Sequence, residues 1–328
     1  MGERFSSRSR QSPQTPQSRQ MSRTYTTTGI NLKSMPLGEN DRLLTILTPE
    51  SGLVRAVAPG ARKPKSRLAG RSALFVVNEL FLARGKSLDR ITQAETITSY
   101  PGLTRNLGIL TASQYLAELV LVQALSEQPH AELFELLNEH LRRLESLSKQ
   151  AKVTEVLPHL THGVFHLLAW GGIAPQVHGC GITQRPIVPD VTRSNWTVAF
   201  AIDAGGVVSE AAQNLDTYKA KPQLKPKGEN AARVREAPAE YRIAPRSRAP
   251  KFHLNATELT LLQRMSLPQL PTLPEEIAHS PSMEAAWITV ERVLRQYAEY
   301  HLGRSIRSAT LVDSYIRSNS VPAPSRPS

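Results

Sequence analysis

The sequence predicts an α+β protein of several domains, in which a five-stranded N-terminal β-barrel precedes an α-helical domain with a turn-rich insertion. Three observations support this fold class. Residues 23–101 consist of short β-branched and apolar runs separated by Gly and Pro, a pattern typical of strands. From residue 102 onward, apolar side chains recur at helical spacing. Residues 173–210 show neither period and are rich in turn-forming residues.

Five runs between residues 23 and 101 have the length and composition of β-strands. A five-stranded Greek-key barrel of this length is an OB-fold, whose face and loops commonly bind oligonucleotides. Strand periodicity alone does not separate an OB-fold from an SH3-like barrel, so both remain open at this point. The predicted strands cover residues 24–35, 41–48, 53–58, 73–84 and 88–100.

Residues 102–172 predict three helices, because apolar side chains lie three or four positions apart. Such stripes usually form the core of a bundle, and we favour this interpretation over a groove for a partner. The pair Gly171–Gly172 is expected to end the third helix. The apolar positions are Leu107, Leu110, Leu116, Leu119 and Val120 in the first helix, Leu133, Leu137, Leu141 and Leu144 in the second, and Leu157, Leu160, Val164 and Leu167 in the third.

A turn-rich insertion with a basic linker is predicted for residues 173–250. Residues 196–209 have the composition of a short hairpin. Residues 211–250 contain many Lys, Arg, Pro and Ala, so they lack the apolar surface needed to offset the entropy of ordering. We therefore expect a disordered linker there, acting either as an electrostatic arm for nucleic acid or as a solvated spacer.

Residues 251–312 are predicted to form C-terminal helices that complete the helical domain. Asn255 begins a sequence that resembles a capping box, which marks the start of a helix. Gly303 is expected to end the last helix. Residues 1–22 and 313–328 are expected to be disordered tails.

The charge balance points to an anionic partner. The chain has 328 residues, with 40 Lys and Arg against 28 Asp and Glu, a net charge of +12. Such an excess concerns partners rather than fold, and nucleic acid is a better candidate than an anionic membrane. No run of about 20 apolar residues is present to anchor the chain in a bilayer. The single cysteine, Cys180, excludes an internal disulfide and is typical of a reducing compartment, so we expect a cytoplasmic, nucleoid-associated protein.

The densest cation cluster lies between Arg55 and Arg71, where six basic residues occur without an acid. Gly and Pro residues predict a flexible loop, on which several cations can neutralise phosphates and release counterions. Without a recognition helix, we expect contacts to the nucleic-acid backbone and weak sequence dependence. A solvated surface without a partner is the alternative. The predicted nucleic-acid-binding residues are Arg42, Arg55, Arg62, Lys63, Lys65, Arg67 and Arg71, and the patch is extended by Lys33, Arg84, Lys86 and Arg90.

Signals for a metal or for catalysis are weak. His178 and Cys180 lie in a Gly-rich turn, but zinc takes four Cys or His ligands and Thr183 stands three positions after Cys180. We therefore expect no cofactor, with Cys180 as a small buried residue. No phosphate loop, nucleophile elbow or zinc-protease motif is present, so we predict no enzymatic activity.

Two arginines on the second predicted helix suggest a partner site. Arg142 and Arg143 flank Leu141 and Leu144, a pattern in which cations adjoin an apolar pocket. We interpret it as a candidate site for an acidic peptide with an apolar end.

Several motifs resemble the RecO family of recombination and repair mediators. The most specific is PLGENDRLLTILTPESGLVRAVAPGARKPKSRLAG, because it places Gly, Glu, Thr and basic residues along some thirty positions. The stretches QAETITSYPGL, YLAELVL, AELFELLNEHLRRL, HLLAWGGIAP and YHLGRSIRSATLV agree with it. The similarity covers most of residues 23–210 and 255–312.

The resemblance implies an OB-fold followed by a helical domain, and binding of single- and double-stranded DNA. It also implies annealing of complementary strands and partnership with RecR and single-stranded DNA-binding protein in loading RecA. The family's DNA-contacting residues would correspond to Arg42, Arg55, Arg62, Lys63, Lys65 and Arg67. Many members bind zinc through paired cysteines in the insertion; here only Cys180 matches, so the insertion looks like a degenerate zinc finger. An RNA-binding barrel protein and, less favoured, a nuclease remain as alternatives.

Overall fold

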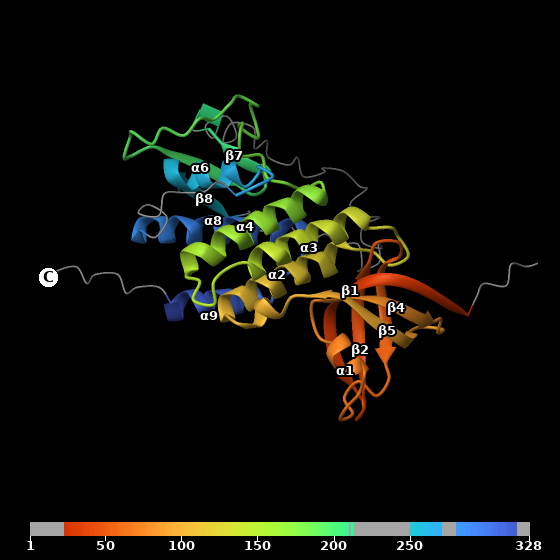
Figure 1. Cartoon of the computed structure of the whole chain (residues 1–328). Coiled ribbons are helices and arrows are strands. Elements are labelled where there is room, and N and C mark those ends of the chain that lie inside the picture. The colour runs from red at the N-terminus through yellow and green to blue at the C-terminus, as the bar shows by residue number, and fades with distance from the viewer. Residues whose placement is uncertain (1–22, 210, 213–249, 271–279, 320–328) are drawn as a thin grey trace, which may run out of the picture.

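The structure is a computed structural model that describes residues 23–209, 211–212, 250–270 and 280–319. It confirms the α+β fold class, because a closed five-stranded barrel precedes a helical bundle. Figure 1 shows the barrel at one end of the bundle and a small second sheet, which belongs to the insertion, at the other end.

The barrel is closed in the strand order β1-β2-β3-β5-β4. The long first strand pairs with two other strands. Its residues 24–30 pair with β4, and its residues 30–37 pair with β2, with an irregular register after Asn31. The short parallel pairing of β3 with β5 completes the ring. This strand order is that of an OB-fold, which the sequence alone did not distinguish from an SH3-like barrel. The strands are β1 (Thr24–Leu37), β2 (Asp41–Thr48), β3 (Gly52–Ala58), β4 (Val76–Ala83) and β5 (Asp89–Ser99).

Alternation along the strands builds the interior of the barrel. In β3, Val54, Ala56 and Ala58 are buried, while Arg55 between them is exposed. Successive side chains of a strand point to opposite faces, so this alternation places Arg55 on the outer surface. A short helix, α1 (Leu68–Arg71), connects β3 to β4 on the side where the basic run lies.

The helical bundle contains α2 (Leu107–Gln123), α3 (Ala131–Glu145) and α4 (Val153–Trp170), packed with the long C-terminal helix α8 (Pro281–Leu302). Most of the predicted apolar positions are buried, but the prediction is wrong at Leu107, which is 59% exposed at the start of α2. Asn106 caps α2 by accepting hydrogen bonds from the N–H groups of Gly108 and Ile109. Gly171 ends α4, and Gly303 ends α8 in a left-handed conformation, so both predicted helix ends are confirmed.

The insertion forms a three-stranded sheet in the order β7-β6-β8. The predicted hairpin is β6 (Thr197–Ala201) with β7 (Gly206–Val208). The third strand, β8 (Lys251–Asn255), was not predicted, because five residues with two apolar side chains carry too little periodicity. It leads directly into α6 (Ala256–Arg264), and Asn255 and Glu258 form the predicted capping box.

The predicted C-terminal tail is wrong over its first residues. Helix α9 (Ala309–Asn319) extends into the range 313–328 that we expected to be disordered. Its buried positions Val312, Tyr315 and Ile316 lie on one face, and the helix packs against α2 and α4. A helix with so short an apolar stripe is stabilised mainly by tertiary packing, which cannot be predicted from the local sequence.

Residues 1–22, most of the predicted basic linker and residues 320–328 lie outside the described residues. Within the described part of the chain, no helix combines the length and the apolar character needed to cross a bilayer.

The barrel and the bundle share one apolar core. Side chains on the barrel's outer surface, including Ile30, Leu47 and Phe75, belong to the same buried cluster as the leucines of α2, α3 and α4. A second, smaller cluster fills the interior of the barrel. The shared core sets the orientation of the basic barrel surface relative to the helices.

Candidate nucleic-acid interface

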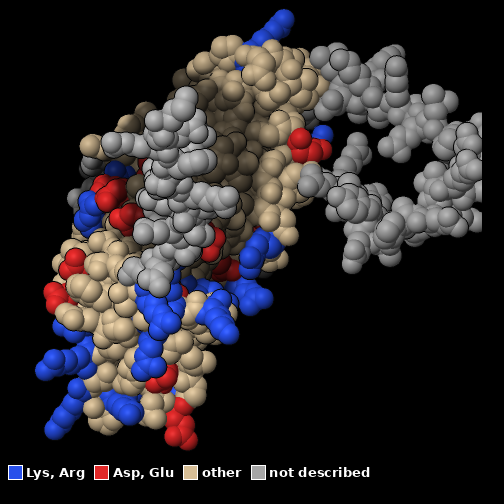
Figure 2. Space-filling view, turned by 90° about the vertical axis from the view of Figure 1, so that its right-hand side faces the viewer, with Lys and Arg blue, Asp and Glu red and all other residues tan. Residues whose placement is uncertain are grey.

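Lys and Arg side chains gather over the barrel in the lower half of Figure 2. The predicted cations come from β2, β3, the segment 59–67 and α1. None of them forms an ion pair with a carboxylate among the residues that the structure describes. Unpaired cations on a common surface are the electrostatic footprint expected of a nucleic-acid-binding protein.

The segment between β3 and α1 is held against the barrel rather than being the free projection that we predicted. Ala61 is 1% exposed and packs into the interior cluster of the barrel. The Asp41 carboxylate accepts a hydrogen bond from the Gly60 N–H at 2.7 Å, and the Asn40 carbonyl accepts one from the Arg62 N–H at 2.8 Å. Gly60 has φ +64, a left-handed conformation that glycine adopts without strain. This turn therefore presents its cations from a fixed base.

Lys63, Lys65 and Arg67 are exposed on this turn, so their charged ends are available to a ligand. Arg71 lies in α1 and not in a loop, which corrects the predicted extent of the loop, whereas Arg55 lies in β3, within the strand predicted for residues 53–58. Helix α1 forms because its backbone finds partners on the barrel. The Arg71 carbonyl accepts hydrogen bonds from the side-chain amides of the buried Asn31 and Asn78, at 2.7 and 2.9 Å.

Arg42 and Arg62 line one cavity, beside the exposed apolar side chains of Met35 and Leu74. The Arg42 guanidinium lies 3.4 Å from both the carbonyl and the hydroxyl of Ser72, at the end of α1. The Arg62 guanidinium donates to the Gly38 carbonyl at 2.8 Å, in the β1–β2 turn. Both cations are therefore positioned by neutral oxygens, which leave their charge uncompensated.

Arg55 lies apart from Arg42 and Arg62, in a second cavity that it shares with Arg84 and Lys86 of the β4–β5 loop. Loops between strands 4 and 5, and the face of strands 2 and 3, are where OB-folds bind oligonucleotides. The Arg84 guanidinium lies 4.7 Å from the centre of the Tyr25 ring, a cation–π arrangement that orients it. Sequence reasoning did not single out Tyr25, because nothing in β1 relates it to a loop sixty residues away.

The two arginines predicted to bind a partner differ in their surroundings. Both Arg142 and Arg143 pair with Glu139, but only Arg143 turns inward, donating to the Pro268 carbonyl at 3.0 Å. Leu141 and Leu144 are fully buried in the bundle, so they do not line a surface pocket beside these cations. Arg142 is 56% exposed but paired with Glu139, whereas Arg143 is also engaged by the Pro268 carbonyl.

Among the residues that the structure describes, no group of three or more potential metal ligands includes Cys180. The thiol is fully buried, and it accepts hydrogen bonds from the N–H groups of Thr183 and Ser209 at 3.5 and 3.4 Å. Burial raises the pKa of the Cys180 thiol, but the hydrogen bonds from Thr183 and Ser209 outweigh it and lower the pKa to about 6. Ala212 completes the cluster where the insertion packs on itself. One sulfur, two hydroxyl residues and an alanine do not fit zinc, which takes Cys and His ligands.

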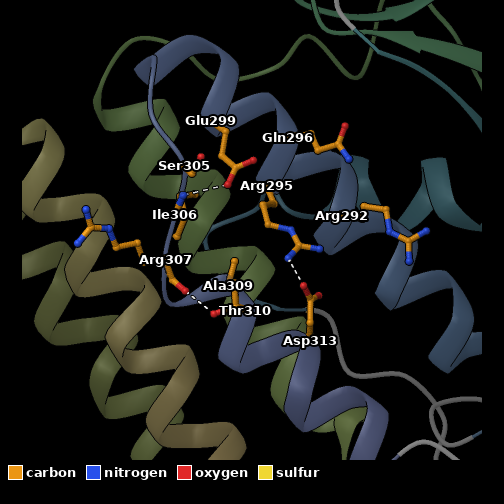
Figure 3. Close-up of a pocket in the computed structure, with 10 residues that line it drawn as sticks. All are labelled: Arg292, Arg295, Gln296, Glu299, Ser305, Ile306, Arg307, Ala309, Thr310 and Asp313. Carbon is orange, nitrogen blue, oxygen red and sulfur yellow. Dashed lines mark hydrogen bonds and ion pairs between the residues drawn. The ribbon is translucent and has the colours of Figure 1, made fainter.

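A further concave site lies between α8 and α9, with a volume of about 580 Å³, and is shown in Figure 3. Arg292 and Arg307 line it, but carboxylates share it. Arg295 donates to Asp313 at 2.8 Å, and the Glu299 carboxylate accepts from the Ile306 N–H at 2.9 Å. The mixed charge makes this cavity, like the one that Glu50, Asp89 and Glu127 share with Arg55, a weaker phosphate site than the cavity lined by Arg42 and Arg62.

Comparison with known proteins gives a consistent result. The family model "Recombination protein O N terminal" matches residues 21–100, and "Recombination protein O C terminal" matches residues 105–218. A DNA repair protein RecO of Nostoc sp. (strain PCC 7120 / SAG 25.82 / UTEX 2576) is 52% identical over 301 residues, covering 91% of this chain and 98% of the relative. That of Gloeothece citriformis is 51% identical over 298 residues, with 90% and 98% covered. That of Synechococcus elongatus is 43% identical over 301 residues, with 92% and 99% covered.

Proposed function

Because the chain belongs to the recombination protein O family of DNA repair proteins, we propose that it acts as a recombination mediator that binds single- and double-stranded DNA and anneals complementary strands. The observation that carries this proposal is the set of unpaired cations on the OB-fold barrel. They occupy β2, β3, the adjoining turn and the β4–β5 loop.

Phosphate neutralisation is the mechanism that these residues support. Duplex DNA carries one negative charge per about 1.7 Å of helix axis, so two strands repel each other as they approach. Arg62, Lys63, Lys65 and Arg67 on the turn, together with Arg55 on β3, screen this repulsion. The bases then pair with each other and supply the sequence specificity, while the protein contacts mainly backbone.

The remaining parts of the proposal concern partners. We infer that the protein acts with RecR and single-stranded DNA-binding protein to help load RecA, without chemistry of its own, in the cytoplasm beside the nucleoid. Arg142 is the more exposed of the two arginines on α3, and an acidic peptide that binds it would displace its partner Glu139. We also propose that the insertion works without zinc, since Thr183, Ser209 and Ala212 surround Cys180.

The test of DNA binding replaces three cations of the turn at once. In the variant Arg62→Ala, Lys63→Ala, Lys65→Ala, we expect weaker binding of a labelled oligonucleotide and a flatter dependence of log K on log salt. The slope should decrease by up to ~2.7, because each phosphate contact contributes about 0.9 on duplex DNA. Fluorescence anisotropy across a salt series measures both quantities.

A matched control removes the same charge elsewhere. Lys149, Arg185 and Lys251 are exposed cations outside the barrel, and their joint change to Ala keeps net charge equal between the two variants. An equal loss of slope in both variants would show that overall charge, and not the barrel surface, governs binding. RNA of equal length in the same assay tests the RNA-binding alternative, which tighter binding of RNA would favour.

Annealing is tested separately with two complementary oligonucleotides coated by their single-stranded DNA-binding protein. We expect the wild-type chain to accelerate annealing, the barrel variant to lose most of this effect, and the control variant to keep it. Intact DNA binding without acceleration would leave a DNA-binding protein that is no annealing factor.

A further inference from the structure

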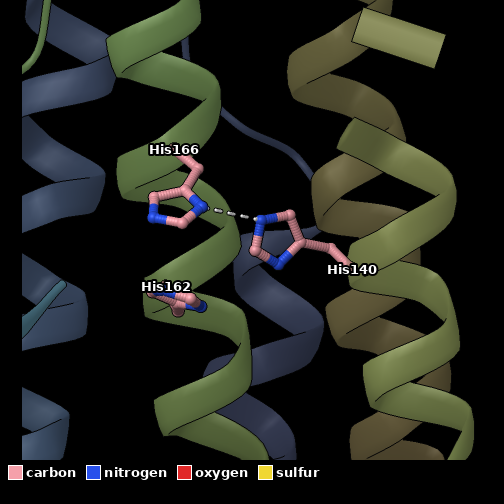
Figure 4. Close-up of side chains that lie close together, drawn as sticks. All are labelled: His140, His162 and His166. Atoms are coloured by element: carbon pink, nitrogen blue, oxygen red, sulfur yellow. Dashed lines mark hydrogen bonds between the residues drawn. The ribbon is translucent and has the colours of Figure 1, made fainter. Parts of the chain in front are cut away.

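Three histidines meet inside the helical domain. His140 comes from α3, and His162 and His166 come from successive turns of α4, as Figure 4 shows. One ring nitrogen of each lies within 4.8 Å of one ring nitrogen of each of the others. His140 and His162 are buried and His166 is half-buried. The sequence placed His162 and His166 on one helix and favoured no metal there, and it gave no sign that His140 of another helix would join them.

The Leu267 carbonyl sets the tautomer of two of these rings. It accepts hydrogen bonds from Nε2 of His162 at 2.8 Å and from Nε2 of His166 at 3.1 Å. A carbonyl only accepts, so the hydrogen of each ring sits on Nε2 and the lone pair sits on Nδ1. A metal-binding histidine usually donates its other ring N–H to a carbonyl or carboxylate in this way.

The third ring lies at the separation that a shared ion requires. Nε2 of His140 lies 3.2 Å from Nδ1 of His166, where a hydrogen of His140 now bridges them. Two nitrogens bound at ~2.0–2.1 Å to one tetrahedral Zn²⁺ are about 3.3 Å apart. If the hydrogen of His140 moves to its Nδ1, Nε2 becomes a ligand and no proton needs to leave the ring.

From this geometry we propose that His140, His162 and His166 form a transition-metal site that binds Zn²⁺ through three imidazoles, with water completing the coordination. Imidazole ligands suit Zn²⁺, Cu²⁺ and Ni²⁺, whereas Mg²⁺ and Ca²⁺ take oxygen ligands. Among the described residues the cluster contains no carboxylate. The site is separate from the Cys180 turn and independent of the proposed DNA binding.

Arg143 is the competitor of the ion. Its Nη1 lies 3.1 Å from Nδ1 of His162 and so occupies the lone pair that the metal would use. The side chain is 25% exposed and shares Glu139 with Arg142, so it has a path outward to solvent. Binding of Zn²⁺ therefore requires the guanidinium to leave His162, which limits the affinity of the unmodified protein.

The bound ion would join three segments of the fold. Its ligands come from α3 and α4, and the second hydrogen bonds of two ligands reach the segment after α6 through Leu267. Because the ion binds the folded chain, it should raise the melting temperature as free Zn²⁺ increases.

Isothermal titration of ZnCl₂ into the metal-free, full-length protein tests the site. We expect saturable binding of one ion, at least tenfold weaker binding in His140→Gln and in His166→Gln, and unchanged binding in Cys180→Ser. Co²⁺ provides a spectroscopic readout, since imidazole ligands give no thiolate charge-transfer band. Absence of saturable binding, or binding that is lost only in Cys180→Ser, would overturn the proposal.

Arg143 supplies a gain-of-affinity test that does not depend on a damaged core. Arg143→Gln should bind Zn²⁺ several-fold more tightly, because it removes the competitor and a nearby positive charge. The matched control is Arg142→Gln, which removes the same charge from the neighbouring, 56% exposed position and should leave affinity nearly unchanged. Equal tightening in both variants, or none in either, would contradict the arrangement proposed here.

Discussion

At the scale of single residues, the structure separates cations that are compensated from cations that are not. Arg295 is bound by Asp313 and Glu291, whereas Arg42 and Arg62 have only neutral oxygen partners among the described residues. A polyanion can therefore bind the guanidinium groups of Arg42 and Arg62 by displacing water, without first breaking an ion pair. The difference decides which basic surface is suited to phosphate, although both sets look alike as letters in the sequence.

Glu291 is a buried carboxyl whose pKa gives a pH-dependent prediction. It is 2% exposed, and Oε1 has no hydrogen-bond partner among the described residues, while Oε2 lies 3.4 Å from Arg295. Burial raises the pKa of Glu291 to about 7 despite the opposing effect of Arg295. Between pH 4.5 and 7 the folded state therefore binds more protons at this site than the unfolded state, so the residue's contribution becomes less favourable as pH rises.

The variant Glu291→Gln removes this titration. The free energy of unfolding of the variant minus that of the wild type should increase between pH 5 and pH 8, by about 1–3 kcal/mol. Urea denaturation of both proteins at the two pH values measures the difference. A difference independent of pH would show that Glu291 remains charged throughout.

At the scale of secondary-structure elements, α9 docks through one close contact that the sequence does not reveal. Its Tyr315 ring lies over Gly108 at the start of α2, and the Tyr315 hydroxyl donates to the Ala151 carbonyl at 3.0 Å. A Cβ added at Gly108 would lie 2.3 Å from the ring. Glycine is thus required here by space rather than by backbone conformation.

The change Gly108→Ala should destabilise the protein by ~1–3 kcal/mol, because the cost of overpacking exceeds the gain in helix propensity. In a background that carries Tyr315→Ala, the same change should cost nothing or stabilise. A double-mutant cycle by urea denaturation tests the coupling, and additive effects of the two changes would contradict it.

At the scale of the whole molecule, the barrel and the bundle are joined by backbone as well as by apolar core. Residues at the β2–β3 turn form backbone hydrogen bonds with the segment between α2 and α3. The Leu53 N–H donates to the Leu125 carbonyl at 3.1 Å, and the His130 N–H donates to the Pro49 carbonyl at 2.8 Å. Gly52 has φ +64, and a Cβ there would lie 2.1 Å from the Leu125 carbonyl oxygen. The two parts are therefore expected to unfold together.

Scanning calorimetry should show a single transition with calorimetric and van't Hoff enthalpies that agree. Gly52→Val should lower the melting temperature and separate the barrel from the bundle, because it combines a strained φ with a clash against Leu125. Two resolved transitions in the wild-type protein would show that the shared core does not couple them.

The local sequence was sufficient for those features that depend on near neighbours. Short β-branched and apolar runs between Gly and Pro located the five strands, and helical spacing located α2, α3, α4 and α8. Asn255 marked the start of a helix, and Gly171 and Gly303 marked helix ends. The run from Arg55 to Arg71 showed that cations would be concentrated in one segment of the chain, without giving their orientation on the barrel. Each of these signals lies within a few residues, where backbone geometry relates side chains directly.

Features that depend on distant contacts could not be found in this way. Strand β8 and helix α9 are stable because they pack on partners far along the chain, and their own stripes are short. The sequence did not show that Arg55 would face Arg84 and Lys86 while Arg42 faced Arg62, since strand register and barrel closure determine both groupings. The same is true of the contact between His140 and His166. The spacing of residues in one helix predicts which face of that helix a side chain lies on, but only the packing of two helices brings their faces together.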